Sequence, residues 1–228
     1  MVDMRPFARS SDHELLDDTR LDPGEIARNL REMAMLNRLP GGVDASVAAV
    51  HRLVERDGAL PVLDIGTGAA HFARRLRRTT PVAIVAADVN HDVLEVARRT
   101  VAGMDRVTVV QADARAMPLP DGSVSVAHSS LLLHHLDPDD AVAAMREMRR
   151  VAASGVVVND LRRSRLAWAM TAAPILAFAR SPVTRHDGIL SARRAYTLHE
   201  LDDLAAQAGL QPVARSSSWW PRVTTTYR

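Results

Sequence analysis

The stretch Val62-Leu-Asp-Ile-Gly-Thr-Gly-Ala-Ala-His71 decides the fold. A short apolar run ends at Asp64 and Ile65, glycines follow at positions 66 and 68, and an arginine-rich helical pattern comes next. This order predicts a buried strand, a tight turn and a helix N-terminus. Because Gly66 and Gly68 carry no Cβ, such a turn lets a ligand approach bare backbone N–H groups. The stretch therefore predicts a site for a nucleoside-type cofactor.

After this stretch, apolar runs alternate with helical patterns. The predicted strands are 61–65, 82–87, 107–111, 124–128 and 155–158. The predicted helices are 43–55, 69–78, 92–101, 139–151 and 197–208, and a final antiparallel pair of strands is predicted at 210–216 and 223–227. Repeated alternation indicates parallel strands joined by right-handed crossovers. We therefore predict an α/β fold with a doubly wound, seven-stranded, mostly parallel sheet.

Two regions lie outside this alternation. Residues 1–42 combine an acidic start with an apolar helical stripe, which predicts an N-terminal helical lid on a domain formed by residues 43–228. Residues 161–195 are predicted to be an insertion over an acceptor pocket. Their apolar run 166–179 is about half as long as a membrane-spanning helix, so we expect no membrane span. Two compatible interpretations of this run stay open: a lid, and a buried helix or the contact face of a homodimer.

Composition excludes several kinds of chemistry. The 228 residues include no cysteine, which excludes disulfides, thiolate metal sites and a cysteine nucleophile. They also include no lysine, so all 29 basic residues are arginine and the high isoelectric point of 9.8 is weak evidence for nucleic-acid binding. Aromatic residues make up 4%, which leaves few platforms for base stacking, and we expect no nucleic-acid partner. The acidic N-terminus does not resemble a signal peptide, and we expect a cytoplasmic protein.

The carboxyl ends of the predicted strands supply further candidate binding residues. Ligands of open α/β sheets bind at these ends, near the point where the strand order reverses. Asp88 lies roughly 20 residues after the glycines, where an acidic side chain can accept hydrogen bonds from ribose hydroxyls. Asp113 follows the next strand and could accept a hydrogen bond from an exocyclic amine. The candidate cofactor-binding residues are Asp64, Gly66, Thr67, Gly68, Asp88, Val89, Asp113, Ala114, His128 and Ser129.

Together these segments resemble the class I S-adenosylmethionine-dependent methyltransferases of the small-molecule type. Residues 62–68 resemble the first motif of the family, Asp88 matches its ribose-binding acid, and 111–114 match its adenine-contacting segment. Residues 119–126, followed by Leu133-His-His135, resemble its fourth-strand region. The resemblance covers about residues 58–160. It implies a Rossmann-like methyltransferase fold with S-adenosyl-L-methionine as the cofactor.

The chain departs from the family pattern at two positions. Ala70 stands where the first motif has its third glycine, and Ser125 stands where the fourth strand often has an acidic residue. A nicotinamide cofactor fits less well, because its fingerprint is G-x-G-x-x-G and Ala-Ala-His follows Gly68 here. Asp64 suits a cofactor with an amino-acid end, whose ammonium it can help to neutralise.

Histidines are the candidate general bases, because their unperturbed pKa lies near neutrality. A base is needed only where the methyl acceptor arrives protonated. His186, a predicted loop residue beside Asp187 and after the apolar insertion, is the preferred base. His134 and His135 are the other candidates, at the mouth of the predicted crevice. The candidate substrate-binding residues are Asn159, Asp160 and Arg193.

Missing motifs narrow the acceptor. No Asn/Asp-Pro-Pro-aromatic motif follows the fourth strand, which disfavours amino-group methylation, and Asn159-Asp160 alone does not indicate a metal-dependent enzyme. We therefore predict no metal and a small organic acceptor with a phenolic or enolic hydroxyl. The looser resemblance is to bacterial O-methyltransferases of secondary metabolism. Two alternatives stay open: a protein that binds the cofactor without methylating, in a binding or rearrangement role, and an RNA methyltransferase.

Overall fold

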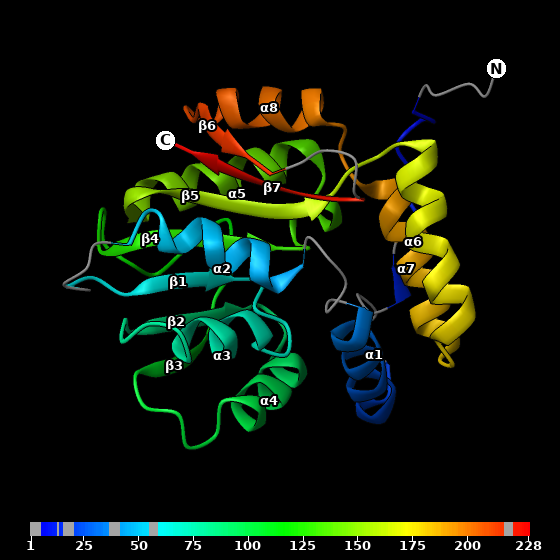
Figure 1. Cartoon of the computed structure of the whole chain (residues 1–228), viewed down its shortest axis with the longest axis horizontal. Coiled ribbons are helices and arrows are strands. Elements are labelled where there is room, and N and C mark those ends of the chain that lie inside the picture. The colour runs from blue at the N-terminus through cyan, green and yellow to red at the C-terminus, as the bar shows by residue number, and fades with distance from the viewer. Residues whose placement is uncertain (1–5, 13, 16–20, 37–41, 55–58, 217–220) are drawn as a thin grey trace.

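A computed structural model describes residues 6–12, 14–15, 21–36, 42–54, 59–216 and 221–228, which form a seven-stranded sheet between helices (Figure 1). The strands are β1 (Val62–Ile65), β2 (Ile84–Asp88), β3 (Val107–Gln111), β4 (Val124–Ser130), β5 (Ala152–Leu161), β6 (Pro212–Arg215) and β7 (Arg222–Tyr227). Their order is β3-β2-β1-β4-β5-β7-β6, and all neighbours are parallel except that β7 runs antiparallel to β5 and β6. The predicted doubly wound, mostly parallel sheet is confirmed.

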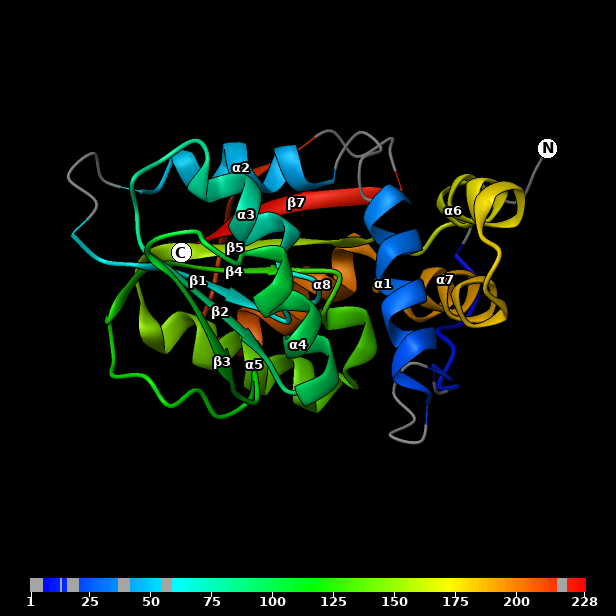
Figure 2. The same ribbon diagram turned by 90° about the horizontal axis from the view of Figure 1, so that it is seen from below.

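Helices cover both faces of this sheet (Figure 2). One face carries α2 (Val43–His51), α3 (His71–Arg77) and α4 (His91–Thr100), and the other carries α5 (Pro138–Val151) and α8 (Leu198–Gln207). Successive side chains of a strand point to opposite faces, so Val62 packs with the first set of helices, whereas Leu63 and Ile65 pack with the second. Because both faces are buried, β1 is apolar throughout apart from Asp64. A buried carboxylate in such a strand needs partners.

Three further helices lie together beside one end of the sheet (Figure 1). They are α1 (Pro23–Leu36), α6 (Arg165–Phe178) and α7 (Pro182–Arg194); α7 packs against both α1 and α6. None of the helices in the described ranges is long and apolar enough to cross a membrane. The apolar run 166–179 forms most of α6, which has 14 residues.

Helix α7 corrects the prediction of a loop around His186. Ser181 caps the helix by accepting a hydrogen bond from the Thr184 backbone, and Pro182 stands in the first turn. The buried face of α7 includes Asp187, Gly188 and other polar or small residues, so it lacks the apolar periodicity that marks a helix in sequence.

Candidate functional site: a cofactor crevice joined to an acceptor cavity

A cavity of about 1050 Å³ lies where the carboxyl ends of β1, β2 and β4 meet α1, α6 and α7. The glycine turn after β1, the β2 end and the residues after β3 form one part of its wall. The loop after β4 and the inner faces of α1, α6 and α7 form the other part. This volume is at the upper end of the range for small-molecule sites, so it can hold a nucleoside cofactor together with a second small molecule.

The glycine turn exposes backbone toward the cavity. Gly66 and Gly68 have φ angles of 65° and 54°, in the left-handed region that glycine adopts readily. A Cβ at Gly66 would lie 2.9 Å from the Leu132 side chain, whereas a Cβ at Gly68 would meet no atom within 4 Å. The space beside Gly68 is therefore open for a ligand. Ala70 adopts a similar φ of 55° and caps α3, so the turn keeps its shape without the third glycine of the family motif.

Asp88 is joined directly to this turn. Its Oδ2 accepts a hydrogen bond from the Gly68 backbone N–H at 3.0 Å, and its Oδ1 accepts one from Asn90 N–H at 3.1 Å. Burial raises the pKa of Asp88, and the nearby charge of Asp64 adds to this, against the opposing effect of the backbone hydrogen bonds. Each oxygen keeps acceptor capacity beyond these bonds, as the predicted ribose contact requires.

Asp64 lies at the bottom of the crevice and has two partners. Parallel pairing of β1 with β4 sets Asp64 beside His128, whose Nδ1 lies 2.8 Å from Asp64 Oδ1. The Thr67 hydroxyl donates to Asp64 Oδ2 at 2.6 Å, and the His128 ring stacks on Phe72 with a centroid distance of 3.7 Å. Asp64 and Thr67 line the cavity, but His128 and Ser129 do not. His128 thus orients Asp64 from behind.

The predicted adenine-contacting residues, Asp113 and Ala114, both line the cavity, as does Val89. Arg115 binds Asp113 at 2.6 Å and Asp140 at 2.9 Å. The hydrogen bonds from Arg115 hold the pKa of Asp113 below its ordinary value. Asp113 is therefore an ionised hydrogen-bond acceptor that Arg115 holds in place at the cavity wall.

On the other side of the cavity, Asp160 orients His134. His134 Nδ1 lies 2.6 Å from Asp160 Oδ1, while Asp160 Oδ2 accepts hydrogen bonds from the backbone N–H groups of Leu133 and His134 at 2.8 and 3.3 Å. Burial raises the pKa of Asp160, but the His134 ring and the Leu161 backbone outweigh burial, so the pKa lies below its ordinary value. An ionised Asp160 accepts a hydrogen bond from His134 Nδ1–H, so the lone pair of a neutral His134 ring lies on Nε2.

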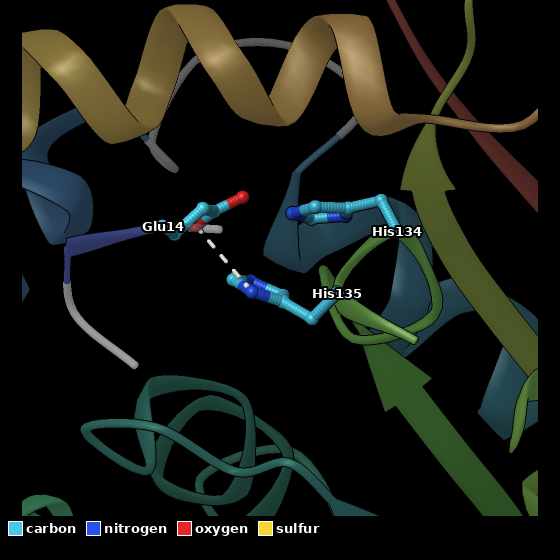
Figure 3. Close-up of side chains that lie close together, drawn as sticks. All are labelled: Glu14, His134 and His135. Carbon is cyan, nitrogen blue, oxygen red and sulfur yellow. Dashed lines mark ion pairs between the residues drawn. The ribbon is translucent and has the colours of Figure 1, made fainter. Parts of the chain in front are cut away.

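His135 forms a second histidine–carboxylate pair, which the sequence did not reveal. Its Nδ1 lies 3.4 Å from Oε2 of Glu14, a buried residue of the N-terminal segment (Figure 3). The Ser191 hydroxyl donates to Glu14 Oε1 at 2.8 Å, and the rings of His134 and His135 lie 4.3 Å apart between centroids. Glu14, His134, His135 and Ser191 all line the cavity.

Besides His128 and Ser129, four predicted site residues do not line the cavity. His186 is half exposed, at 49% of its side chain, and its Nδ1 lies 2.8 Å from Asp187 Oδ1; Asp187 lines the cavity but His186 does not. Arg193 is exposed at the end of α7 and also does not line the cavity. Asn159 is buried and does not line the cavity; its amide donates to the Gly42 carbonyl and the Ser46 hydroxyl. Asp160, too, acts from behind the wall, through His134.

Arg222, which the sequence analysis did not single out, does line the cavity. It donates to Asn159 Oδ1 at 3.1 Å and to the Ser130 hydroxyl at 2.8 Å. Burial lowers the pKa of Arg222 to about 10, although the charge of Asp160 acts in the opposite direction. Antiparallel pairing of β7 with β5 brings Arg222 to this edge, and no local motif marks that pairing.

Comparison with known proteins agrees with this geometry. A methyltransferase-domain family model matches residues 62–155, the segment that runs from β1 into β5 and includes the glycine turn, Asp88 and Asp113. This segment is a methyltransferase domain of the class I S-adenosylmethionine-dependent type. The open space at Gly68 and the acceptor oxygens of Asp88 and Asp113 fit the cofactor of this family, S-adenosylmethionine.

Two curated relatives of this chain differ in the atom that their names say is methylated. A malonyl-[acyl-carrier protein] O-methyltransferase of Halorhodospira halophila is 34% identical over 116 residues, which is 47% of this chain and 39% of the relative. A ubiquinone/menaquinone biosynthesis C-methyltransferase of Hahella chejuensis is 30% identical over 125 residues, which is 49% of each chain. The matches thus span half or less of either relative.

Solved structures show the same fold along more of the chain. The crystal structure of an S-adenosylmethionine-dependent methyltransferase from Aquifex aeolicus superposes with a TM-score of 0.63. The superposition covers 91% of this chain and 98% of that one at 18% sequence identity. At this level of identity the likeness concerns the fold alone.

Proposed function

We propose that this protein transfers a methyl group from S-adenosylmethionine to a hydroxyl oxygen of a small apolar acceptor, of phenolic or enolic type, in secondary metabolism. The observation that carries the proposal is that His134, whose Nδ1 lies 2.6 Å from Asp160 Oδ1, lines the same cavity as the glycine turn and Asp88. One cavity can thus hold the cofactor at one side and present a histidine to the acceptor at the other.

The lining of the acceptor side supports a small apolar molecule. Ile26, Leu30 and Met33 of α1 line it together with Met170 and Ile175 of α6. Such side chains bind an apolar ring and exclude water, and water exclusion strengthens each polar contact inside the site. A residue set of this kind offers few groups to a nucleic acid.

The residues of the chain divide the work of binding and proton transfer. When bound, S-adenosylmethionine supplies an electrophilic methyl group on a sulfonium. Asp88 would hold the ribose, Asp113 and Ala114 the adenine, and Asp64 would face the amino-acid end. Alignment of two bound reactants is the main contribution of such a protein, with effective molarities on the order of 10⁵–10⁸ M.

His134 is the general base of this proposal. Its Nε2 takes the proton of the acceptor hydroxyl, and the oxygen becomes the nucleophile. Asp160 is a positioning residue: it fixes the ring and its tautomer and stabilises the imidazolium that forms. Arg222, at the edge of the cavity, would favour an anionic acceptor oxygen. His135 has the same ring chemistry, but its carboxylate partner lies at 3.4 Å rather than 2.6 Å.

Methyl transfer is tested with methyl-labelled S-adenosylmethionine and a panel of phenols and enols. We expect label in at least one acceptor, and a loss of about 10²–10⁴-fold in kcat for His134→Gln. The matched control is His199→Gln, because His199 is 86% exposed on α8 and lies outside the cavity. Saturable cofactor binding with no label transfer to any acceptor would favour a binding or rearrangement role. Equal activity of His134→Gln and wild type would remove His134 as the base.

A further inference from the structure

Glu14, His134 and His135 form a cluster that the proposed reaction does not fully use (Figure 3). Each offers one ligand atom, and these three atoms all lie within 4.8 Å of one another. Two histidines and one carboxylate are a common ligand set of divalent transition metals, and zinc binds this set in open sites with a further position for water or substrate. We propose that this cluster binds a divalent transition-metal ion of the zinc type, and that the ion blocks the base.

The distances allow such binding after a small adjustment. Metal–ligand bonds of about 2.0–2.2 Å require ligand atoms roughly 3–3.5 Å apart. Glu14 Oε2 and His135 Nδ1 are already 3.4 Å apart. The longer separations between ligand atoms, up to 4.8 Å, must shorten by on the order of 1 Å. Rotation of an imidazole ring and of the glutamate side chain allows a shift of this size.

The surroundings hold the ligands as metal sites do. A metal-binding histidine usually donates its other ring N–H to a carboxylate, and His134 Nδ1 lies 2.6 Å from Asp160 Oδ1. Ser191 holds the other oxygen of Glu14 at 2.8 Å. Two of the three ligands are buried, Glu14 and His134 at 4% and 2% exposure, and His135 is partly buried; burial strengthens the attraction of a carboxylate for a cation.

The backbone that carries both histidines is fixed. It forms the short 3₁₀ helix η2 (Leu133–His135). Arg194 donates to the carbonyls of His134 and His135 at 3.1 and 2.7 Å, and Arg9 donates to the His134 carbonyl at 3.2 Å. These guanidinium groups bind carbonyl oxygens rather than the ring nitrogens, so they fix the direction in which the rings project.

Metal binding and proton transfer would compete. An ion binds His134 through the Nε2 lone pair, and the same lone pair accepts the acceptor proton in the proposed reaction. The ion-bound protein is therefore inactive, and this consequence alone rests on the proposed function. The sequence could not indicate the site, because Glu14 is separated from the two histidines by more than a hundred residues.

Binding is tested by titrating the chelator-treated full chain with Co²⁺ and then with Zn²⁺. We expect one Co²⁺ per chain with the visible absorption of a four- or five-coordinate ion, which Zn²⁺ abolishes by displacement. In histidine ¹H–¹⁵N spectra of the wild-type chain, Zn²⁺ should shift the ring nitrogens of His134 and His135 but not those of His128. This measurement requires no substitution. Absence of saturable binding, or shifts confined to other histidines, would overturn the proposal.

Variants locate the ion and separate it from catalysis. Glu14→Gln and His135→Gln should each weaken Co²⁺ binding at least about 100-fold, and Ser191→Ala about 10-fold, while His199→Gln binds like wild type. Unchanged binding in both ligand variants would overturn the site. If no acceptor is ever methylated, the proposed function fails while the Co²⁺ result still stands. If methylation occurs, Zn²⁺ should abolish it and a chelator should restore it.

Discussion

Substituting Gly68 by alanine tests whether a cofactor approaches the backbone of the glycine turn. At Gly68 the φ angle is 54°, and an added Cβ would meet no protein atom within 4 Å. The left-handed conformation costs an alanine roughly 1–2 kcal/mol, and the stiffer unfolded chain offsets about 0.4–1 kcal/mol of this. The net loss in the free energy of unfolding should therefore be about 1 kcal/mol. Ala70, at a φ of 55°, shows that the fold tolerates such a residue.

The chain offers a matched control at Gly122. Its φ is 61°, an added Cβ would again meet no atom within 4 Å, and it precedes β4 outside the cavity. Gly122→Ala should therefore lose about the same stability as Gly68→Ala in urea unfolding. The new methyl group at position 68, in contrast, occupies the open side of the cofactor crevice.

Calorimetry with S-adenosylmethionine and S-adenosylhomocysteine then separates folding from binding. We expect Gly68→Ala to weaken both ligands at least about tenfold, which corresponds to about 1.4 kcal/mol, and Gly122→Ala to leave both unchanged. An unchanged Kd in Gly68→Ala would refute the inference that the cofactor lies against this turn. Equal weakening in both variants would show that backbone strain, rather than contact, lowers affinity.

Three further predictions concern single side chains. Asp88→Asn should weaken S-adenosylmethionine binding by about 1.5–3 kcal/mol in calorimetry. Because the pKa of Asp88 is raised, the affinity of the wild type should begin to fall, as the pH is lowered, at a pH above the ordinary aspartate range. The variant should lack this pH dependence. Because the pKa of Asp160 is lowered, wild-type stability should fall as the pH drops below about 3.9 through that pKa; a denaturation series with the same acid slope in Asp160→Asn would contradict the pairing with His134. Tyr196→Phe should cost about 1 kcal/mol in urea unfolding, because its hydroxyl donates to the Leu136 carbonyl at 2.7 Å, and no cost would contradict that bond.

Local patterns in the sequence were enough to predict the fold. The strand predicted at 107–111 has the observed bounds, and α5 begins one residue before its predicted start. Buried parallel strands are continuous apolar runs, and the turns between them carry glycine, proline or capping residues, so both leave a local signal. The strand predicted at 155–158 is shorter than β5, which begins at Ala152 directly after α5 with no turn residue between them.

Local sequence patterns also predicted residues on one side of the cavity. Gly68, Asp88 and Asp113 all line it, because each lies at or just after a strand end, and the ends of parallel strands meet at one edge of the sheet. Whether they bind the cofactor stays a prediction.

The acceptor side depends on contacts between distant segments. Glu14 meets His135 only through packing of the N-terminal segment, and Arg222 meets Asn159 only through pairing of β7 with β5. Proximity in sequence to an aspartate drew attention to His186, but the helical geometry of α7 directs it away from the cavity that Asp187 lines.

The most direct test of the central claim is a crystal structure with S-adenosylhomocysteine. We predict electron density for the ligand in the cavity, with the ribose hydroxyls on Asp88, the adenine beside Asp113 and Ala114, and the sulfur directed toward His134. Density at another place, or a ligand whose ribose does not contact Asp88, would contradict the assignment of this cavity as the shared site of cofactor and acceptor.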